Sequence, residues 1–323
     1  MSVMKVQKLR LNKNNTTLKH QKIETVLKDI KANLEIYVLI LPTLLYFIIF
    51  KYFPMYGAQI AFKNFIPVKG ICGSEWVGFK HFIRFFESPY FTEVVLNTFL
   101  LSVYSLIAGF PLPIALAILL NYQKNLHFKK VVQTVSYAPH FISTVVMVGM
   151  LKIFTSPING IINKIIVAVG GEAKHFMASP EYFKHLFVWS GIWQNIGWSS
   201  IIYIGALSAI SIELHEAAIV DGAIIWQRIW NIDLPGIAPT IIILLILSTG
   251  SVLSVGFEKV YLMQNDLNTS VSEVISTYTY KMGLIQSQYS FSSAVGLFNS
   301  IINFVLLITV NIIARKLGET SLF

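Results

Sequence analysis

The chain has 323 residues, of which 54% are hydrophobic and only 13% are charged, and its mean hydropathy is +0.64. Soluble domains carry about 25% charged residues, so this composition excludes an ordinary soluble protein and indicates a polytopic membrane protein. The formal net charge of +9 therefore bears on membrane topology. Cys72 is the only cysteine, which excludes an internal disulfide and a cysteine metal site.

Residues 1–33 form a polar, basic N-terminal segment with eight Lys or Arg against two acids, Glu24 and Asp29. The segment is too long and too polar for the charged region of a secretory signal. We expect a solvated tail that stays in the cytoplasm and touches anionic membrane lipid. Nucleic-acid binding is the alternative for such a tail, but we expect no nucleic-acid partner.

Six stretches after the tail are long and apolar enough to cross a hydrocarbon core of about 30 Å, which takes about 20 helical residues. Internal prolines such as Pro42, Pro111 and Pro139 predict kinked helices that pack on one another. The sequence therefore predicts an all-α, polytopic membrane protein with about six transmembrane helices. The stretches lie at about 34–53, 96–120, 132–154, 187–210, 238–257 and 293–313.

The positive charges predict the topology. With the basic tail inside, six crossings return the C-terminus to the cytoplasm, where Arg315 and Lys316 follow the last span. The connection 121–131 carries three lysines and falls on the same side. We expect a multi-pass protein of the cytoplasmic membrane with both termini in the cytoplasm, a tail at 1–33 and one six-helix domain at 34–323.

Aromatic residues cluster in the external connection 54–95, which contains GSEWVGFKHFIRFFESPYF. Aromatic side chains at a membrane boundary favour an interfacial belt. The residues concerned are Trp76, Phe79, Phe82, Phe85 and Phe86.

The fourth span holds the densest polar and aromatic cluster, FVWSGIWQNIGWSS at 187–200. A sugar in transit needs hydrogen-bond partners and flat apolar faces, and amides at mid-membrane are costly unless they face a cavity or another helix. Helix packing is the alternative for the tryptophans, and an interhelical hydrogen bond is the alternative for the amides. The candidate substrate-path residues are Tyr104, Trp193, Gln194, Asn195, Trp198, Asn299 and Asn303.

Residues 216–235, EAAIVDGAIIWQRIWNIDLP, connect two apolar segments, yet twelve of the twenty are themselves apolar. The Asp-Gly pair at 221–222 is a stop signal after a short helix, and Trp226 and Trp230 lie one turn apart on a second. Pro235 ends that second helix, because proline disfavours the α conformation in the residue before it. Two apolar helices outside the bilayer bury their faces in a groove on a partner protein, on their own chain, or among lipid headgroups.

The spacing Glu-Ala-Ala, three residues, Gly, nine residues, Ile-x-Leu-Pro closely resembles the signature loop of permease subunits of bacterial ABC importers. In that family the loop is the cytoplasmic element that seats in a cleft of the ATPase subunit. The resemblance implies the type I importer permease fold, with a coupling loop at 213–237. The implied ATPase-coupling residues are Glu216, Ala217, Ala218, Gly222, Trp226, Trp230, Ile232, Leu234 and Pro235.

Two further regions resemble carbohydrate permeases of this family. The Trp-Val-Gly-Phe run that ends in Ser-Pro-Tyr-Phe before Asn97-Thr98 resembles the segment before a span in sugar-transporting permeases. GFEKVYLMQN at 256–265 and the C-terminal region resemble permeases for polysaccharide fragments, including those of alginate and pectin. The resemblance implies an ATP-driven importer that moves an oligosaccharide or polysaccharide by alternating access.

The same resemblance implies the partners. They are a second permease that completes a heterodimer, two ATPase subunits, an external solute-binding protein, the oligosaccharide and membrane lipid. ATP and Mg belong to the ATPase subunits, and we expect no cofactor on this chain.

Several catalytic motifs are absent from the sequence. It contains no G-x-x-x-x-G-K-[ST] loop, so we do not expect this chain to bind ATP. It has no H-E-x-x-H, no His/Cys cluster and no serine at nucleophile-elbow spacing, so we expect neither a catalytic residue nor a metal site.

Lys and Arg are nearly absent from the span interiors, which leaves the charge of the substrate open. A permease for an amino acid or peptide is one alternative function. A membrane scaffold that recruits an ATPase without transporting anything is another.

Overall fold

The computed structural model describes residues 32–316. The basic tail expected at 1–33 therefore lies almost wholly outside the described residues. The chain divides into two compact units between Gln59 and Ile60, and each unit is described by itself.

The described part of the first unit is helical throughout. It contains α2 (Leu34–Phe47), a π-helical turn η1 (Ile48–Tyr52) and α3 (Phe53–Met55), and it leads into the 3-10 helix η2 (Tyr56–Phe62). In the π-helical turn the N–H of Phe53 bonds to the carbonyl of Ile48, five residues back. This wider turn precedes Pro54, which has no N–H to donate.

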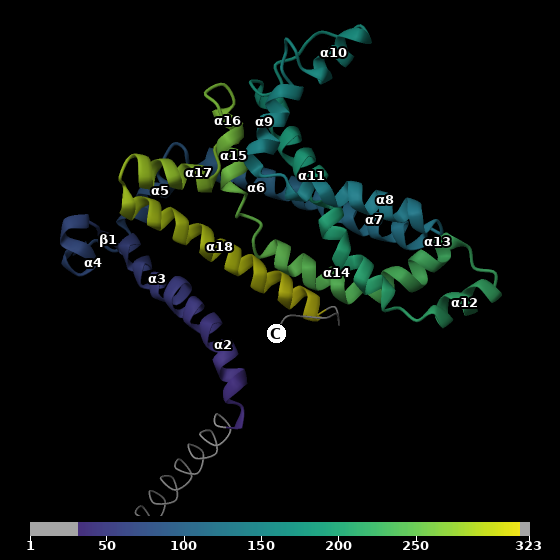
Figure 1. Cartoon of the computed structure of the whole chain (residues 1–323). Helices are drawn as coiled ribbons and strands as arrows, with labels where there is room; N and C mark the ends of the chain where they lie inside the picture. The colour runs from purple at the N-terminus through teal and green to yellow at the C-terminus, as the bar shows by residue number, and fades with distance from the viewer. Residues whose placement is uncertain (1–31, 317–323) are drawn as a thin grey trace, which may run out of the picture. The chain divides into compact units, whose positions relative to one another are not determined.

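The second unit opens with a short antiparallel ribbon in which β1 (Lys63–Asn64) pairs with β2 (Glu75–Trp76). Helices make up most of the rest of this unit, and several of the long ones run along its length (Figure 1). The α-helices are α4 (Gly70–Gly73), α5 (Lys80–Phe86), α6 (Phe91–Gly109), α7 (Pro111–Tyr122), α8 (Leu126–Tyr137), α9 (Thr144–Phe154), α10 (Ile161–Ala168), α11 (Pro180–Ser208), α12 (Ile212–Val220), α13 (Ile225–Arg228), α14 (Leu234–Thr249), α15 (Phe257–Met263), α16 (Thr269–Ser272), α17 (Ile275–Tyr280) and α18 (Tyr289–Lys316). The other helical turns are η3 (Pro67–Lys69), η4 (Ala138–Phe141), η5 (Ile229–Asp233) and η6 (Lys281–Ile285).

Side chains mark where several of these helices begin. Asn125 accepts hydrogen bonds from the N–H groups of His127 and Phe128 at the start of α8. Ser143 caps α9 and Ser211 caps α12 in the same manner. Such caps satisfy backbone donors that have no partner inside the helix.

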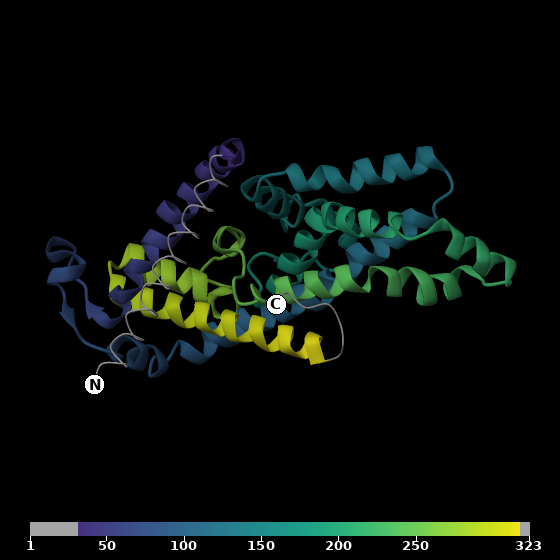
Figure 2. The same cartoon turned by 90° about the horizontal axis from the view of Figure 1, so that it is seen from below.

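Figure 1 and Figure 2 both place α12 and α13 at one end of the second unit and α5 and α17 at the other. α11 packs against α6, α7, α8 and α14. The segment at 213–237 thus lies far from the external aromatic connection, as expected if the two are on opposite sides of a membrane.

Within residues 32–316, four helical runs are long and apolar enough to cross a membrane, and the number rises to six if two bent pairs each count as one span. The four runs are Leu34–Phe62, Phe91–Tyr122, Ile225–Thr249 and Tyr289–Lys316. The bent pairs are Leu126–Phe141 with Thr144–Phe154, at 102°, and Pro180–Ser208 with Ile212–Val220, at 71°. The predicted count of about six agrees with the upper figure.

Two predicted spans differ from the structure. The helix expected at 132–154 is broken, because η4 around Pro139 ends α8 and Ser143 caps a new helix in another direction. The span expected at 238–257 begins earlier and ends at Thr249, after which the chain turns through 250–256.

α11 connects two hydrophobic clusters of this unit. Near its start, Phe183 and Phe187 pack with residues of α6, α9 and α15. Near its end, Tyr203 and Leu207 pack with residues of α7 and α14. Helices in a membrane associate through van der Waals contact and hydrogen bonds rather than through hydrophobicity alone, so these contacts fix the position of α11.

The interfacial belt expected from the external aromatics is wrong for two of its members. Phe82 and Phe85 are buried, and Phe85 packs edge-on against Phe298 of α18 at 5.5 Å between ring centroids. Trp76, Phe79 and Phe86 stay exposed. One face of helix α5 packs against α18. Composition alone does not reveal which aromatic residues lie on that buried face.

Asn97 and Thr98 fasten α6 to the segment between α15 and α18. The Asn97 amide donates to the carbonyl of Ser270 at 2.8 Å. The Thr98 hydroxyl accepts from the N–H of Ile275 at 2.9 Å and donates to the carbonyl of Val94. Thr98 is fully buried, so no water replaces these bonds.

We expect Thr98→Val to destabilise the protein by about 1–3 kcal/mol, because it leaves the buried N–H of Ile275 without an acceptor. The measurement is the thermal unfolding midpoint of the detergent-purified chain. Thr309→Val is the matched control, since the exposed Thr309 hydroxyl bonds only within its own helix. Equal midpoints for both variants would show that this bond does not hold α17 to α6.

Candidate functional site

The predicted coupling segment, 213–237, forms α12, a turn, α13, the π-helical turn η5 and the start of α14. α12 ends at Val220, and Gly222 has a φ of +79°. This left-handed conformation is one that glycine adopts without steric cost. The predicted helix stop at 221–222 is confirmed.

The expected end of the second helix at Leu234-Pro235 is wrong. Leu234 has α-helical dihedral angles, with φ −62° and ψ −45°, and the helix runs from α13 through η5 into α14. Proline normally clashes with the carbonyl four residues before it. In η5 the N–H of Leu234 bonds to the carbonyl of Ile229, five residues back, and this wider spacing precedes Pro235 directly.

Apolar side chains of the coupling segment are exposed. Trp226 is 68% exposed and Trp230 is 67% exposed, one turn apart, and Val220 at the end of α12 is 87% exposed. Glu216, Ala217 and Gly222 are exposed as well, whereas Ala218, Ile232 and Leu234 are half-buried and Pro235 is exposed. The predicted coupling residues thus form one continuous segment with an uncovered apolar surface.

Asp233 joins this segment to the helix bundle. Its side chain is fully buried, and its Oδ2 accepts a 2.6 Å hydrogen bond from the hydroxyl of Tyr122 at the end of α7. His215 Nε2, in α12, lies 3.5 Å from Oδ1. The Arg228 guanidinium stacks over the Tyr122 ring at 5.3 Å.

The spacing that ends in Ile-x-Leu-Pro identified the neighbours of Asp233 as coupling residues. It missed Asp233 itself, because Asp233 occupies the variable position x. A carboxylate in an apolar segment is the signal that was available, because a buried charge requires partners. Here one partner, Tyr122 of α7, lies 111 residues earlier in the chain. The other, His215 of α12, lies within the coupling segment itself.

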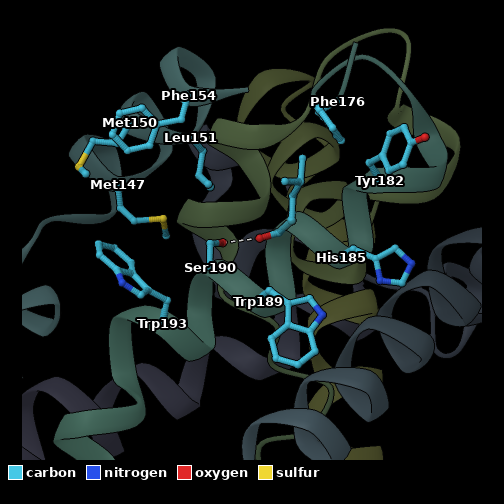
Figure 3. Close-up of a pocket in the computed structure, with 11 residues that line it drawn as sticks. Met147, Met150, Leu151, Phe154, Phe176, Tyr182, His185, Trp189, Ser190 and Trp193 are labelled. Carbon is cyan, nitrogen blue, oxygen red and sulfur yellow. Dashed lines mark hydrogen bonds between the residues drawn. The ribbon is translucent and has the colours of Figure 1, made fainter. Parts of the chain in front are cut away.

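The substrate-path candidates divide over different faces of α11. Trp193 lines a cavity of about 380 Å³ between α9 and α11, together with Trp189 and His185 (Figure 3). Tyr104 lies beside this cavity: its hydroxyl accepts from Trp189 Nε1 at 2.9 Å and bonds His185 Nδ1 at 2.9 Å. Most of the side chains that line this cavity are apolar.

Gln194 and Asn195 line a different cavity of about 290 Å³, bounded by α6, α7, α11 and α15. A neighbouring hollow of about 610 Å³ contains Trp198 and shares Ser105 and Ser199 with it. These two hollows share lining residues alongside α11, and together we call them the α11 cleft. Hydroxyl and amide groups gather in this cleft, whereas the cavity of Figure 3 offers few of them.

His140 was missed by sequence reasoning. Its ring stacks on Trp198 with centroids 4.5 Å apart, and its Nδ1 bonds Asn195 Oδ1 at 3.0 Å. His140 follows Pro139 at the break between α8 and α9, and the break brings it to α11. The assumption of an unbroken third span concealed this contact.

Asn299 and Asn303 line none of these cavities. Asn303 accepts from the N–H of Leu253 at 3.0 Å and donates to the hydroxyl of Ser254 at 3.1 Å, so it ties α18 to the turn after α14. The Asn299 Oδ1 is buried without a hydrogen-bond partner among residues 32–316. The structure thus separates these two residues from the amides of α11.

The comparisons with known proteins identify the family. Residues 94–319 match the family described as binding-protein-dependent transport system inner membrane component. Protein LplB of Bacillus subtilis is 44% identical over 294 residues, which cover 91% of this chain and 92% of that protein. The polygalacturonan/rhamnogalacturonan transport system permease protein YteP of the same organism is 44% identical over 288 residues, covering 89% and 90%.

A solved structure is also similar. It is the crystal structure of a bacterial ABC transporter involved in the import of the acidic polysaccharide alginate. A chain of that structure has 39% sequence identity to this chain and superposes with a TM-score of 0.83. The match covers 90% of this chain and 98% of that chain. This chain belongs to the family of binding-protein-dependent transport system inner membrane components. It is a multi-pass membrane permease of the ABC importer class, so the predicted family and helical membrane fold are confirmed.

We expect Asp233→Ala to loosen the junction between the coupling segment and the bundle by about 1–3 kcal/mol, because the half-buried Tyr122 hydroxyl loses its acceptor. The measurement is amide hydrogen exchange of α12 in the purified protein, which should become faster. Asp221→Ala, which removes an exposed carboxylate from the same segment, is the control. Identical exchange in the two variants would contradict a structural role for Asp233.

Proposed function

We propose that this chain is one half of a heterodimeric permease in an ABC importer that carries an oligosaccharide across the cytoplasmic membrane by alternating access. A second permease, two ATPase subunits and an external solute-binding protein complete the importer. ATP and Mg bind to the ATPase subunits. This chain binds no cofactor and supplies the helices and the coupling segment.

The observation that carries the proposal is the geometry of the coupling segment. α12 and α13 lie at one end of the second unit. α12 exposes Val220, and the helix that begins with α13 exposes Trp226 and Trp230. A groove on an ATPase subunit buries such apolar anchors. Asp233 links the segment to α7 through Tyr122. A displacement of the segment by an ATPase is therefore transmitted to the helices that border the α11 cleft.

The substrate class is inferred from the relatives and from the α11 cleft. One relative is a permease for polygalacturonan and rhamnogalacturonan, and a similar solved structure is of a transporter that imports alginate. The cleft combines the indole of Trp198 with the amides of Gln194 and Asn195, and sugars need both flat apolar faces and hydrogen-bonding groups.

The topology that fits this role has the coupling segment in the cytoplasm. The two connections that contain α5 and α17 then lie outside. α18 begins beside α5 and carries Arg315 and Lys316 in its last turn. Basic residues after a span favour the cytoplasmic side. Both termini are then cytoplasmic.

Co-purification from native membranes tests the assembly. We expect this chain to purify with a second permease and two copies of an ATPase, and we expect oligosaccharide-loaded binding protein to stimulate ATP hydrolysis. Purification of the chain without an ATPase would overturn the importer proposal and favour a scaffold or another transport mechanism.

We expect Gly222→Val to uncouple ATP hydrolysis from transport, because a β-branched residue is strained at the φ of +79° that the turn requires. The measurement is the ratio of oligosaccharide uptake to ATP hydrolysis in proteoliposomes, which should fall by about fivefold or more for a strain of about 1–3 kcal/mol.

Gly222→Asn is the matched control for this prediction, because asparagine tolerates the left-handed conformation far better than valine. It should retain most of the coupling. A Gly222→Val importer that transports normally would show that the bend has no part in coupling.

A further inference from the structure

Lys259 of α15 lines the part of the α11 cleft that contains Gln194 and Asn195. Of the described residues that line this cavity, it alone carries a charge. α15 lies outside the candidate membrane spans, so the sequence offered no reason to place this lysine beside α11. The turn at 250–256 brings it there.

The Lys259 ammonium contacts only neutral groups of α11. Its Nζ donates to the carbonyl of Phe187 at 2.6 Å and lies 4.6 Å from the centre of the Phe187 ring. A side chain at Gly191 would place its Cβ 3.1 Å from Nζ, so the glycine leaves room for the ammonium. Among residues 32–316, no carboxylate lies within 4.0 Å of Nζ.

An ammonium in this position lacks a counter-ion. Burial lowers the pKa of Lys259 to about 7, because removal from water penalises the charged form. An anion that enters the cavity restores the charged form and offsets this penalty. Retaining a partly buried lysine without a charged protein partner is costly, and a ligand that supplies the missing negative charge accounts for it.

Neutral hydrogen-bonding groups surround the same space. The Ser105 hydroxyl lines it and is buried without a hydrogen-bond partner among the described residues. Gln194 and Asn195 each use one amide donor, to the carbonyls of Ile142 and Gly191. A side-chain amide has two N–H donors, so each retains one for a ligand.

We propose that Lys259 binds the carboxylate of a uronic-acid residue during transport and thereby selects acidic over neutral oligosaccharides. This inference rests on the proposed function and adds the charge of the substrate. One ammonium and a few neutral groups match a carboxylate, which carries one negative charge. A phosphate monoester carries about −1.5 to −2 at neutral pH and calls for more cations than this cavity has. The cavity, at about 290 Å³, is at the lower end of small-molecule sites, which measure about 300–1,000 Å³, and suits a single sugar ring.

The test compares trigalacturonate with its neutral methyl ester in proteoliposomes that contain the complete importer and saturating binding protein. The quantity measured is the ratio of acid uptake to ester uptake in wild type and in Lys259→Met. Any preference of the binding protein acts equally on both permeases and cancels when the two ratios are compared. We expect the ratio to fall by about tenfold or more in the variant, as for loss of a charged hydrogen bond.

Lys164→Met is the control, because Lys164 is an exposed lysine of α10 that lines none of these cavities. Its ratio should equal that of wild type. Ester uptake by Lys259→Met shows that the variant is folded and assembled. An unchanged ratio in Lys259→Met would overturn the role of Lys259 and leave the importer intact. If the wild-type importer takes up neither sugar but another oligosaccharide on its binding protein stimulates ATP hydrolysis, the uronate proposal is wrong and the importer stands. If no oligosaccharide stimulates hydrolysis, the proposed function itself is wrong.

Discussion

The buried carboxylate of Asp233 is the interaction on which the link between the coupling segment and the helix bundle depends. A fully buried carboxylate is tolerated only with compensating partners. Tyr122 of α7 donates a hydrogen bond to it, and His215 of α12 lies 3.5 Å away. The requirement fixes the register of the π-helical turn η5 against both helices. The exposed face with Trp226 and Trp230 is then held in a defined position relative to the bundle rather than on a free loop.

A similar use of polar groups positions the segments that come after α14. Asn303 holds the turn after α14 to α18, and Thr98 holds the start of α17 to α6. Asn268 donates to the carbonyls of Met177 and Met263, which connects the segment before α11 with that after α15. Because apolar contact gives little discrimination between helix arrangements inside lipid, these directional bonds decide the arrangement and carry α15 to the side of α11.

Composition and periodicity were enough to predict a helical membrane protein, and the spacing of Glu216, Gly222 and Pro235 was enough to predict the family. Local rules failed where a distant contact decided the outcome. Pro235 does not end its helix, because η5 widens the turn before it. Phe85 is in the core and not at the membrane interface, because α18 covers it. Lys259 follows the span expected at 238–257, and nothing near it in the chain reveals the turn that returns it to the α11 cleft.

A single cation in the cleft is consistent with transport rather than storage. A pathway has to attract its solute strongly enough for entry and release it readily enough for exit. Several ammonium groups around one carboxylate would deepen the binding well and slow release. Lys259 instead has a pKa lowered toward neutrality by burial, and its alternative partner is the neutral carbonyl of Phe187. When the solute leaves, the ammonium returns to that carbonyl, so the free energy gained on binding a uronate is limited by a contact already present in the empty pathway.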